Sequence, residues 1–236
     1  MTQATGANLS DLLGIGIYTV SEAAKYARVP TTKLARWILG TSRSRPVVIA
    51  QIDPSKNTDR WVTFLDFIQC MAIRDIRIYW PNIHLDKIRS TIDMARQKFN
   101  IEYPFAMKHA TYRFGDQIIL EIPGYGTIEA TGPHKSQLNM RRVIEQYLED
   151  LSWDAKGLAA KYTPFSFRGH DIVLDPSIQF GEPTVNPGRY TVSTLCNAYE
   201  AEGGYDAAAK AYGVPKEAVE AAMRYNFDYL RTSEAA

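Results

Sequence analysis

The stretch from Tyr18 to Gly40, YTVSEAAKYARVPTTKLARWILG, determines how the chain begins to fold. Ser21 followed by a glutamate is typical of a helix N-cap, so a first short helix is predicted there. A valine-proline turn follows, and Thr31 or Thr32 is predicted to cap a second helix that the glycine at position 40 ends. Two short helices joined by a tight turn predict a helix-turn-helix.

The second helix of this stretch has an apolar and a polar side. Leu34, Trp37 and Ile38 recur at helical spacing and are predicted to face the core. The polar side is predicted to enter the major groove of DNA, although a solvated face has the same composition. The residues of that side are Thr32, Lys33 and Arg36.

A β-hairpin is predicted directly after these helices. Residues Pro46–Ile52 and Arg60–Phe64 are β-prone, and the polar run Asp53–Asp59 between them is typical of a turn. A hairpin at this place forms a wing whose basic side chains contact DNA phosphates. The basic residues of the predicted wing and its flanks are Arg43, Arg45, Lys56 and Arg60.

Two further helices, Leu65–Tyr79 and Leu85–Phe99, complete a predicted first domain over residues 15–100. This order of elements resembles the N-terminal domain of MerR-type winged-helix regulators. That pattern usually has a glycine where Arg28 stands here, and a left-handed backbone at Arg28 would add strain of about 1 kcal/mol. The matching residues are Tyr18-Thr19-Val20-Ser21-Glu22-Ala23-Ala24, Val29, Leu34, Trp37 and Val62-Thr63-Phe64-Leu65-Asp66.

Residues 101–168 are predicted to form a β-meander followed by a helix. Strands Tyr112–Phe114 and Ile118–Ile122 flank a Gly-Asp turn, and a third strand covers Thr127–Ala130. Ser136–Leu151 has apolar residues at helical spacing and is predicted as a helix. This module connects the first domain to the last. In an alternative reading it binds a small molecule, and the chain is then an effector-sensing regulator.

Charge divides along the chain. Residues 1–100 hold 14 Lys and Arg against 8 Asp and Glu, a net charge of +6. Residues 101–168 hold 8 of each kind, and residues 169–236 hold 5 against 10, a net charge of −5. A basic region attracts a polyanion and an acidic region repels it. We therefore expect DNA to contact the first domain and not the last.

Residues 169–236 begin with an arm rich in Gly and Pro and end in helices predicted at Ser193–Ala201, Tyr205–Tyr212 and Pro215–Leu230. The arm resembles the motif of a small antitoxin domain long known only as a domain of unknown function. Phe180 stands for the first glycine of that motif, and Glu182 stands for its lysine. The matching runs are Ile172-Val173-Leu174-Asp175-Pro176, Phe180-Gly181-Glu182-Pro183-Thr184-Val185 and Gly188-Arg189-Tyr190-Thr191-Val192.

Together with the winged helix, this domain makes the chain similar to VapB-type antitoxins. The resemblance implies a PIN-like ribonuclease toxin as partner and a double-stranded DNA operator that the chain represses. Arg189 either pairs with Asp175 across the arm or reaches the carboxylates of the nuclease. Glu217 and Glu220 are expected to cover basic residues around the nuclease's substrate groove.

The last two helices predict a homodimer. They form a second helix-turn-helix, and its acidic character favours dimerisation over a second DNA site. A broad apolar stripe on the terminal helix is expected to need a partner surface. The stripe consists of Val219, Ala222, Met223, Phe227 and Leu230.

The expected fold is mainly α with small β elements, in the α+β class. Cys70 and Cys196 lie far apart in apolar surroundings, which indicates reduced thiols in a cytoplasmic protein. The histidines are scattered, so neither a metal site nor a cofactor is predicted. No acidic cluster suited to a nuclease stands out, and the chain is predicted not to be an enzyme. No apolar run approaches the ~20 residues of a membrane span.

Overall fold

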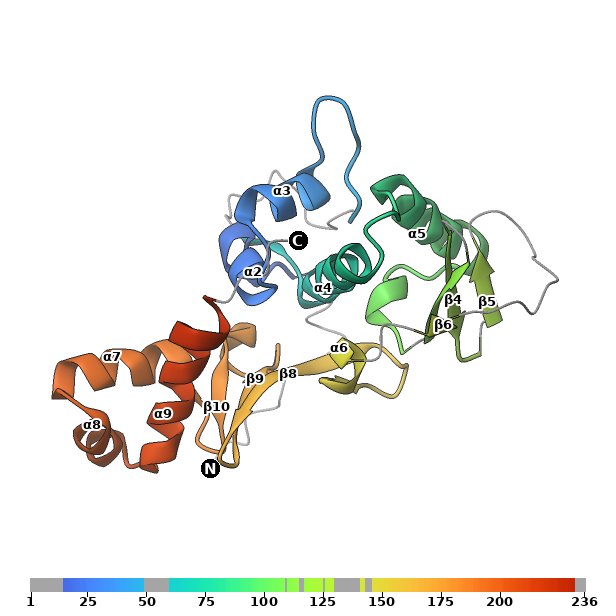
Figure 1. Cartoon of the computed structure of the whole chain (residues 1–236). Coiled ribbons are helices and arrows are strands. Elements are labelled where there is room, and N and C mark those ends of the chain that lie inside the picture. The colour runs from blue at the N-terminus through green and yellow to red at the C-terminus, as the bar shows by residue number, and fades with distance from the viewer. Residues whose placement is uncertain are drawn as a thin grey trace.

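The computed structural model describes residues 15–48, 60–108, 110–114, 117–124, 126–129, 141–142 and 146–231. Within them the fold is α+β, as the sequence predicts: a helical N-terminal region, a small antiparallel sheet, a longer antiparallel sheet and three C-terminal helices. The N-terminal helices lie against the longer sheet, and the small sheet and the C-terminal helices lie on opposite sides of the molecule (Figure 1).

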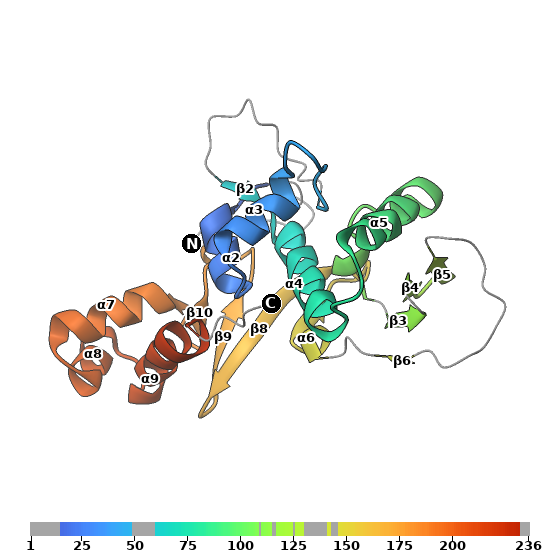
Figure 2. The same cartoon turned by 45° about the horizontal axis from the view of Figure 1, so that its top comes forward.

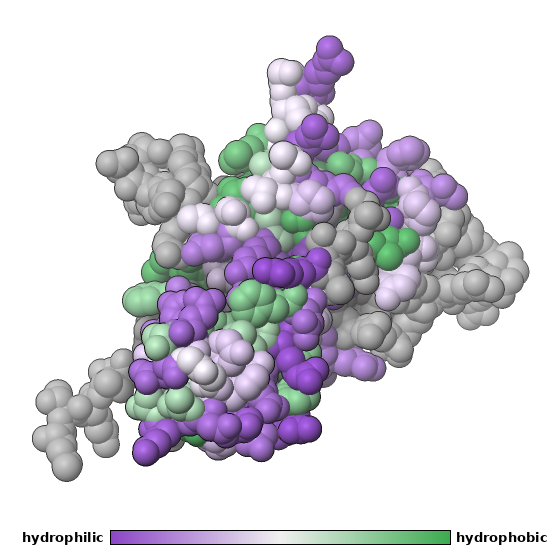
Figure 3. Space-filling view, turned by 60° about the vertical axis from the view of Figure 1, so that its left-hand side comes forward, coloured by the Kyte–Doolittle hydropathy of each residue, from purple (hydrophilic) through white to green (hydrophobic). Residues whose placement is uncertain are grey.

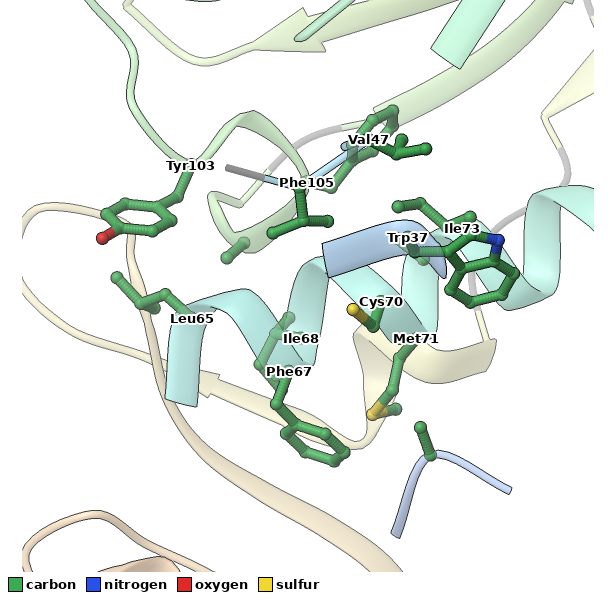
Figure 4. Close-up of a cluster of buried hydrophobic side chains, with 14 of the residues drawn as sticks. Trp37, Val47, Leu65, Phe67, Ile68, Cys70, Met71, Ile73, Tyr103 and Phe105 are labelled. Atoms are coloured by element: carbon green, nitrogen blue, oxygen red, sulfur yellow. The ribbon is translucent and has the colours of Figure 1, made fainter. Parts of the chain in front are cut away.

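The N-terminal region is built around one buried helix. Its elements are β1 (Tyr18–Thr19), α2 (Val20–Tyr26), α3 (Thr31–Leu39), β2 (Arg60–Val62), α4 (Phe64–Tyr79), α5 (Leu85–Phe99) and the 3-10 turn η1 (Pro104–Ala106). Side chains of α4 share one buried cluster with Trp37 of α3 and Phe105 of η1 (Figure 4). Figure 2 shows α2 and α3 stacked beside α4, with β2 next to them. The predicted helices at 65–79 and 85–99 are confirmed to within one residue.

The first two helices begin elsewhere than predicted. Thr19, not Ser21, caps α2: its Oγ1 accepts a hydrogen bond from the Glu22 N–H at 3.1 Å, and a Glu22 carboxylate oxygen accepts from the Thr19 N–H at 2.8 Å. This reciprocal capping box satisfies two N–H groups at the helix start, which a serine cap two residues later would not do. Neither threonine caps α3, because Pro30 is its N-cap and Thr31 is already helical.

The predicted wing is corrected in part. Residues 46–48 form no strand, because the Val47 and Val48 N–H groups donate to the Trp37 carbonyl at 2.7 and 3.0 Å. The second predicted strand is short, since a helix begins at Phe64, and it pairs antiparallel with β1. Residues 49–52 of the first predicted strand lie outside the described residues. The predicted tip, Asp53–Asp59, lies outside the described residues.

The small sheet confirms the predicted meander. Its strands are β3 (Ala110–Phe114), β4 (Gln117–Ile122), β5 (Gly126–Glu129) and β6 (Arg141–Arg142), in the order β5-β4-β3-β6. The helix predicted at Ser136–Leu151 is confirmed only at Gln146–Glu149 among the described residues. Residues 141–142 pair with β3, the helix α6 covers only Gln146–Glu149, and Leu151 begins a strand. Leu151 is buried there opposite Tyr162, so strand pairing overrides the local helical pattern.

None of the strands of the longer sheet is predicted from the sequence. It consists of β7 (Leu151–Trp153), β8 (Ala159–Phe167), β9 (His170–Leu174), β10 (Thr184–Asn186) and β11 (Tyr190–Thr191), paired in reverse chain order. The turn between β8 and β9 falls at Arg168-Gly169, where the sequence places the border between the middle and last regions. Strands of both regions therefore share one sheet. Whether the three predicted domains fold separately stays a prediction.

The C-terminal helices follow the sequence closely. They are α7 (Val192–Glu202), α8 (Tyr205–Tyr212), α9 (Lys216–Arg224) and a π-helical turn, η3 (Tyr225–Tyr229), which continues α9. The predicted dimer stripe packs inside the chain: Val219 and Ala222 are fully buried, Leu230 is nearly so, and Met223 and Phe227 are half-buried. Val219, Ala222, Met223 and Leu230 pack against α7, α8 and the sheet, whereas Phe227 lies outside these clusters and lines a surface pocket. Most of the stripe therefore needs no second copy, and the reason given for a dimer is corrected.

A buried acid in α4 predicts a specific pH dependence of stability. Burial raises the pKa of Asp66 to about 6, although hydrogen bonds from Thr63 lower it. Because the folded chain holds this proton more tightly than the unfolded chain, its stability falls as pH rises from about 4 to about 6. The fall is on the order of 3 kcal/mol at most.

Asp66→Asn removes this titration. Relative to the wild type, the variant is expected to gain stability from about pH 4 to about pH 6 and to keep a constant difference above it. Urea unfolding at a series of pH values measures this difference. Asp150, whose burial also raises its pKa to about 6, is present in both chains and cancels. A difference that does not change with pH would contradict the prediction.

Candidate nucleic-acid and partner interfaces

One candidate interface is the polar side of α3. Leu34, Trp37 and Ile38 are buried as predicted, so the opposite side of α3 faces solvent. Thr32 and Arg36 are exposed and Lys33 is half-buried. Together with Arg43 and Arg45 in the following loop, these three residues are called the basic face below.

A tight loop extends the basic face beyond the end of α3. Gly40 ends the helix with φ 74°, a left-handed conformation that L side chains rarely adopt. Thr41 and Ser44 then exchange backbone hydrogen bonds of 2.7 and 3.2 Å, which exposes the residues between them, including Arg43. The loop projects from the molecule and ends in hydrophilic side chains (Figure 3).

The cations of the basic face are not equivalent. Arg45 forms an ion pair with Asp93 of α5. Arg36 and Arg43 form no ion pair within the described part of the chain, so both guanidinium groups remain available for phosphates or bases. Arg89 holds the loop: it is buried, and its Nε donates to the carbonyls of Arg45 and Pro46 at 3.2 and 3.3 Å. Sequence reasoning missed this role, because it depends on a contact across more than forty positions.

The side chains of two predicted DNA-binding residues, Lys56 and Arg60, are not described. Lys56 lies outside the described residues. Arg60 begins β2, which pairs with β1, but its side chain is not described. Their expected contacts with phosphates stay a prediction.

The turn between α2 and α3 has the left-handed residue that the sequence pattern indicates. Arg28 has φ 55°, so the strain expected of a non-glycine residue is present. Two contacts offset it. The Arg28 guanidinium lies 4.6 Å from the centre of the Tyr229 ring, and the Arg74 guanidinium donates to the Ala27 carbonyl at 2.9 Å. The turn is thus held by the C-terminal π-helical turn and by α4.

Arg189 does not form the ion pair that the sequence suggested. Its side chain is exposed, and its backbone has φ 59° in the turn before β11. The Asp175 carboxylate instead accepts hydrogen bonds from the Ser177 N–H and hydroxyl at 2.9 and 2.6 Å. The structural role is therefore corrected, and a role in binding a partner stays a prediction.

The two predicted partner-binding glutamates lie on α9. Glu217 and Glu220 are both half-buried, and a carboxylate oxygen of Glu220 lies 3.5 Å from a guanidinium nitrogen of Arg168 in the β8–β9 turn. Lys216, beside them, pairs with Asp206 at 2.9 Å. The acidic surface of this helix is thus partly neutralised by neighbouring cations.

Sequence reasoning missed how the arm joins the N-terminal strand. The Tyr18 hydroxyl donates to the Gly181 carbonyl at 2.8 Å, in the 3-10 turn η2 (Gln179–Gly181). A Cβ at Gly181 would lie 2.5 Å from that hydroxyl, so only glycine fits. Phe180, next to it, is 73% exposed. The one sequence signal for this site was an aromatic residue where the motif has glycine.

The described residues contain neither a metal-binding group nor a helix suited to a membrane. No group of three or more His, Cys, Asp or Glu side chains there is placed to hold a metal ion. No helix in the same ranges has the length and apolar character that a membrane crossing requires. Cys70 and Cys196 are both free and buried.

The loop of the basic face leads to a prediction about Gly40. Gly40→Ala should lower the free energy of unfolding by about 1–3 kcal/mol, because its Cβ would lie 2.7 Å from the Ser44 carbonyl oxygen in a left-handed backbone. Gly204→Ala is the control, since Gly204 has φ 154° and ψ 172°, in the same glycine-only region as Gly40 with ψ −162°, and has open space around its Cβ. Urea unfolding of both variants separates strain from steric contact. Equal losses would mean that the contact with the loop contributes nothing.

Comparisons with known proteins agree with this arrangement of elements. The family model described as "Protein of unknown function (DUF433)" matches residues 172–226, from β9 through α9. Two proteins of Mycobacterium tuberculosis (strain ATCC 25618 / H37Rv) are similar along most of the chain. "Putative antitoxin VapB45" is 22% identical over 89% of this chain and 93% of its own length. "Uncharacterized protein Rv2308" is 23% identical over 94% of both.

A solved structure has the same fold. The X-ray crystal structure of Rv2018 from Mycobacterium tuberculosis superposes with a TM-score of 0.62, covering 89% of this chain and 98% of that one, at 17% sequence identity. The likeness therefore extends over most of both chains.

Proposed function

We propose that the chain is an antitoxin that neutralises a PIN-like ribonuclease in the cytoplasm and represses its own operator, a double-stranded DNA, as a homodimer. The observation that carries this proposal is the similarity to "Putative antitoxin VapB45" over 89% of the chain. Because that similarity is not confined to the arm, it supports one protein in which DNA binding and partner binding are combined.

The basic face supports the DNA-binding half of the proposal. Arg36 on α3 and Arg43 in the projecting loop are exposed cations without ion pairs in the described residues, and the N-terminal region has a net charge of +6 over residues 1–100. A helix in the major groove with a flanking basic loop on the phosphates is the usual geometry of such domains.

The acidic C-terminal region supports the partner-binding half. A ribonuclease presents basic residues around its RNA groove, and a region with a net charge of −5 over residues 169–236 can cover them. Arg189, exposed and without an ion pair in the described residues, supplies a cation for the carboxylates of the nuclease.

Co-expression with the neighbouring reading frame tests this function. We expect the two products to co-purify, and the isolated partner to cleave RNA until this chain is added. Arg189→Ala should release nuclease activity, and Glu217→Lys with Glu220→Lys should slow association at low salt. Glu202→Lys, on the exposed end of α7, is the control. DNA release by a small molecule, without any protein partner, would instead favour an effector-sensing regulator.

A further inference from the structure

Two hollows meet at one glutamate between the arm and the N-terminal helices. The first, of about 430 Å³, is lined by Ile15, Gly16, Ile17, Gln179, Phe180 and Glu182, and is called the apolar hollow. The second, of about 380 Å³, lies between α2, α7 and η3 and also includes Glu182. It is called the acidic hollow, because Glu22, Glu182 and Glu200 line it against one cation, Lys25.

The apolar hollow presents an exposed aromatic side chain on a constrained backbone. Phe180 is 73% exposed and Ile15 is 48% exposed. Gln179 and Phe180 have φ 48° and 51°, two consecutive left-handed residues that persist only where the surroundings hold them. The Tyr18 hydroxyl supplies that hold through the Gly181 carbonyl. A large, exposed apolar side chain on a constrained backbone is typical of a residue that anchors a protein partner.

The acidic hollow has carboxylates with no partner of their own. Lys25 donates to the Asn226 side-chain oxygen at 3.2 Å, and Glu22 caps α2. Glu182 and Glu200 make no side-chain hydrogen bond or ion pair with the described part of the chain. Such groups favour a ligand that brings several donors.

The other chemistries that this hollow suggests do not fit. No cluster suited to a metal ion is found in the described residues. Burial, and then the charge of Glu200, raise the pKa of the Cys196 thiol to about 11, so this cysteine stays protonated and unreactive. A cation on an apolar side chain fits best. Pro183 and Phe227 line the hollow with apolar surface, and Glu182 and Glu200 supply carboxylates to the same hollow.

We propose that the two hollows together bind a segment of a protein partner in which an apolar side chain lies beside an arginine. The apolar side chain packs on Phe180 and Ile15, and the guanidinium group enters the acidic hollow to pair with Glu182 and Glu200. Arginine fits better than lysine because its planar fork can bond two carboxylates at once. The identification of the partner as a basic ribonuclease rests on the proposed function. The match between the two hollows and an apolar side chain beside an arginine rests on the lining residues alone.

A peptide probe tests the surface without the partner. The blocked tripeptide leucyl-alanyl-arginine amide is titrated into the full chain labelled with nitrogen-15, beside the same peptide with citrulline in place of arginine. We expect the arginine peptide to shift the amide signals of Glu182, Asn197 and Asn226, and the citrulline peptide to bind about tenfold more weakly or worse. Equal binding of the two peptides, or shifts confined to other residues, would overturn the proposal.

Variants with matched controls test the same residues. Glu182→Gln with Glu200→Gln should weaken arginine-peptide binding about tenfold or more, and Phe180→Ala should do so too. Glu202→Gln and Tyr79→Ala, an exposed acid and an exposed aromatic outside both hollows, should leave it unchanged. A double variant, Leu12→Ser with Leu13→Ser, tests whether the chain's own N-terminal segment occupies the surface. If this variant bound the peptide more tightly than the wild type, the segment would be the occupant and the proposal would be overturned.

The co-expressed ribonuclease separates this proposal from the proposed function. If it binds the wild type and the hollow variants equally well, the antitoxin function stands and the hollows are not the partner site. If no ribonuclease binds but the arginine peptide does, the surface stands and the antitoxin function fails. If neither binds, both are wrong.

Discussion

Replacing Phe67 by alanine is expected to lower the free energy of unfolding by about 3–5 kcal/mol. Phe67 is fully buried in α4, and its ring centre lies 5.5 Å from that of Tyr18 and 6.0 Å from that of Tyr162. Tyr18 belongs to β1 and Tyr162 to β8 of the longer sheet. The substitution therefore opens a cavity where the N-terminal helices meet that sheet.

Urea unfolding followed by circular dichroism measures this loss. We expect one transition at a lower urea concentration, because one buried cluster runs from Ile17 to Leu174 and β9 joins it to the cluster of the C-terminal helices. Tyr79→Ala, in the same helix but 50% exposed, should change stability by less than about 0.5 kcal/mol. Two separate transitions, with only the first displaced, would show that the C-terminal region folds independently, as the predicted domain borders imply.

Replacing Arg36 by alanine is expected to weaken operator binding by about 1–3 kcal/mol and to relax specificity at one base pair. Arg36 is exposed on α3 and has no ion pair in the described residues, so its guanidinium is available to a base edge. Arg43 lies in the loop beyond Gly40, where a phosphate is the expected contact. Arg43→Ala should weaken binding to all sequences alike and reduce the salt slope by about one unit.

Fluorescence anisotropy with the DNA upstream of the reading frame, over a range of salt concentrations, gives both quantities. Lys156→Ala is the control, because Lys156 is an exposed cation in the β7–β8 turn, away from the basic face. If Lys156→Ala weakened binding as much as Arg36→Ala, charge alone would explain the affinity. The basic face would then have no special role.

Local patterns in the sequence determined the helices and the division of charge. The spacing of Leu34, Trp37 and Ile38 placed the inner side of α3 correctly, because a helix that packs on a core must repeat its apolar residues every 3.6 positions. The same rule gave α5 and α8 with their observed bounds. The spacing of Thr19 and Glu22 also fits a capping box, which is the cap that the structure shows in place of the predicted Ser21.

Contacts between distant segments were decided only by the tertiary structure. Strand β2 pairs with β1, some forty positions away, and β7 replaces the end of a helix that the local pattern favoured. Strand pairing joins residues far apart in the chain, so a short window of sequence cannot specify it.

The candidate sites divide in the same way. Helical spacing predicts the exposure of Arg36. The hydrogen bonds from Arg89 to the loop and from Tyr18 to Gly181 join distant segments, so only the assembled fold shows them. The stripe that includes Val219 and Leu230 is apolar in the sequence, but only packing shows that α7, α8 and the sheet cover it. Apolar periodicity states that a face is buried; it does not state which surface buries it.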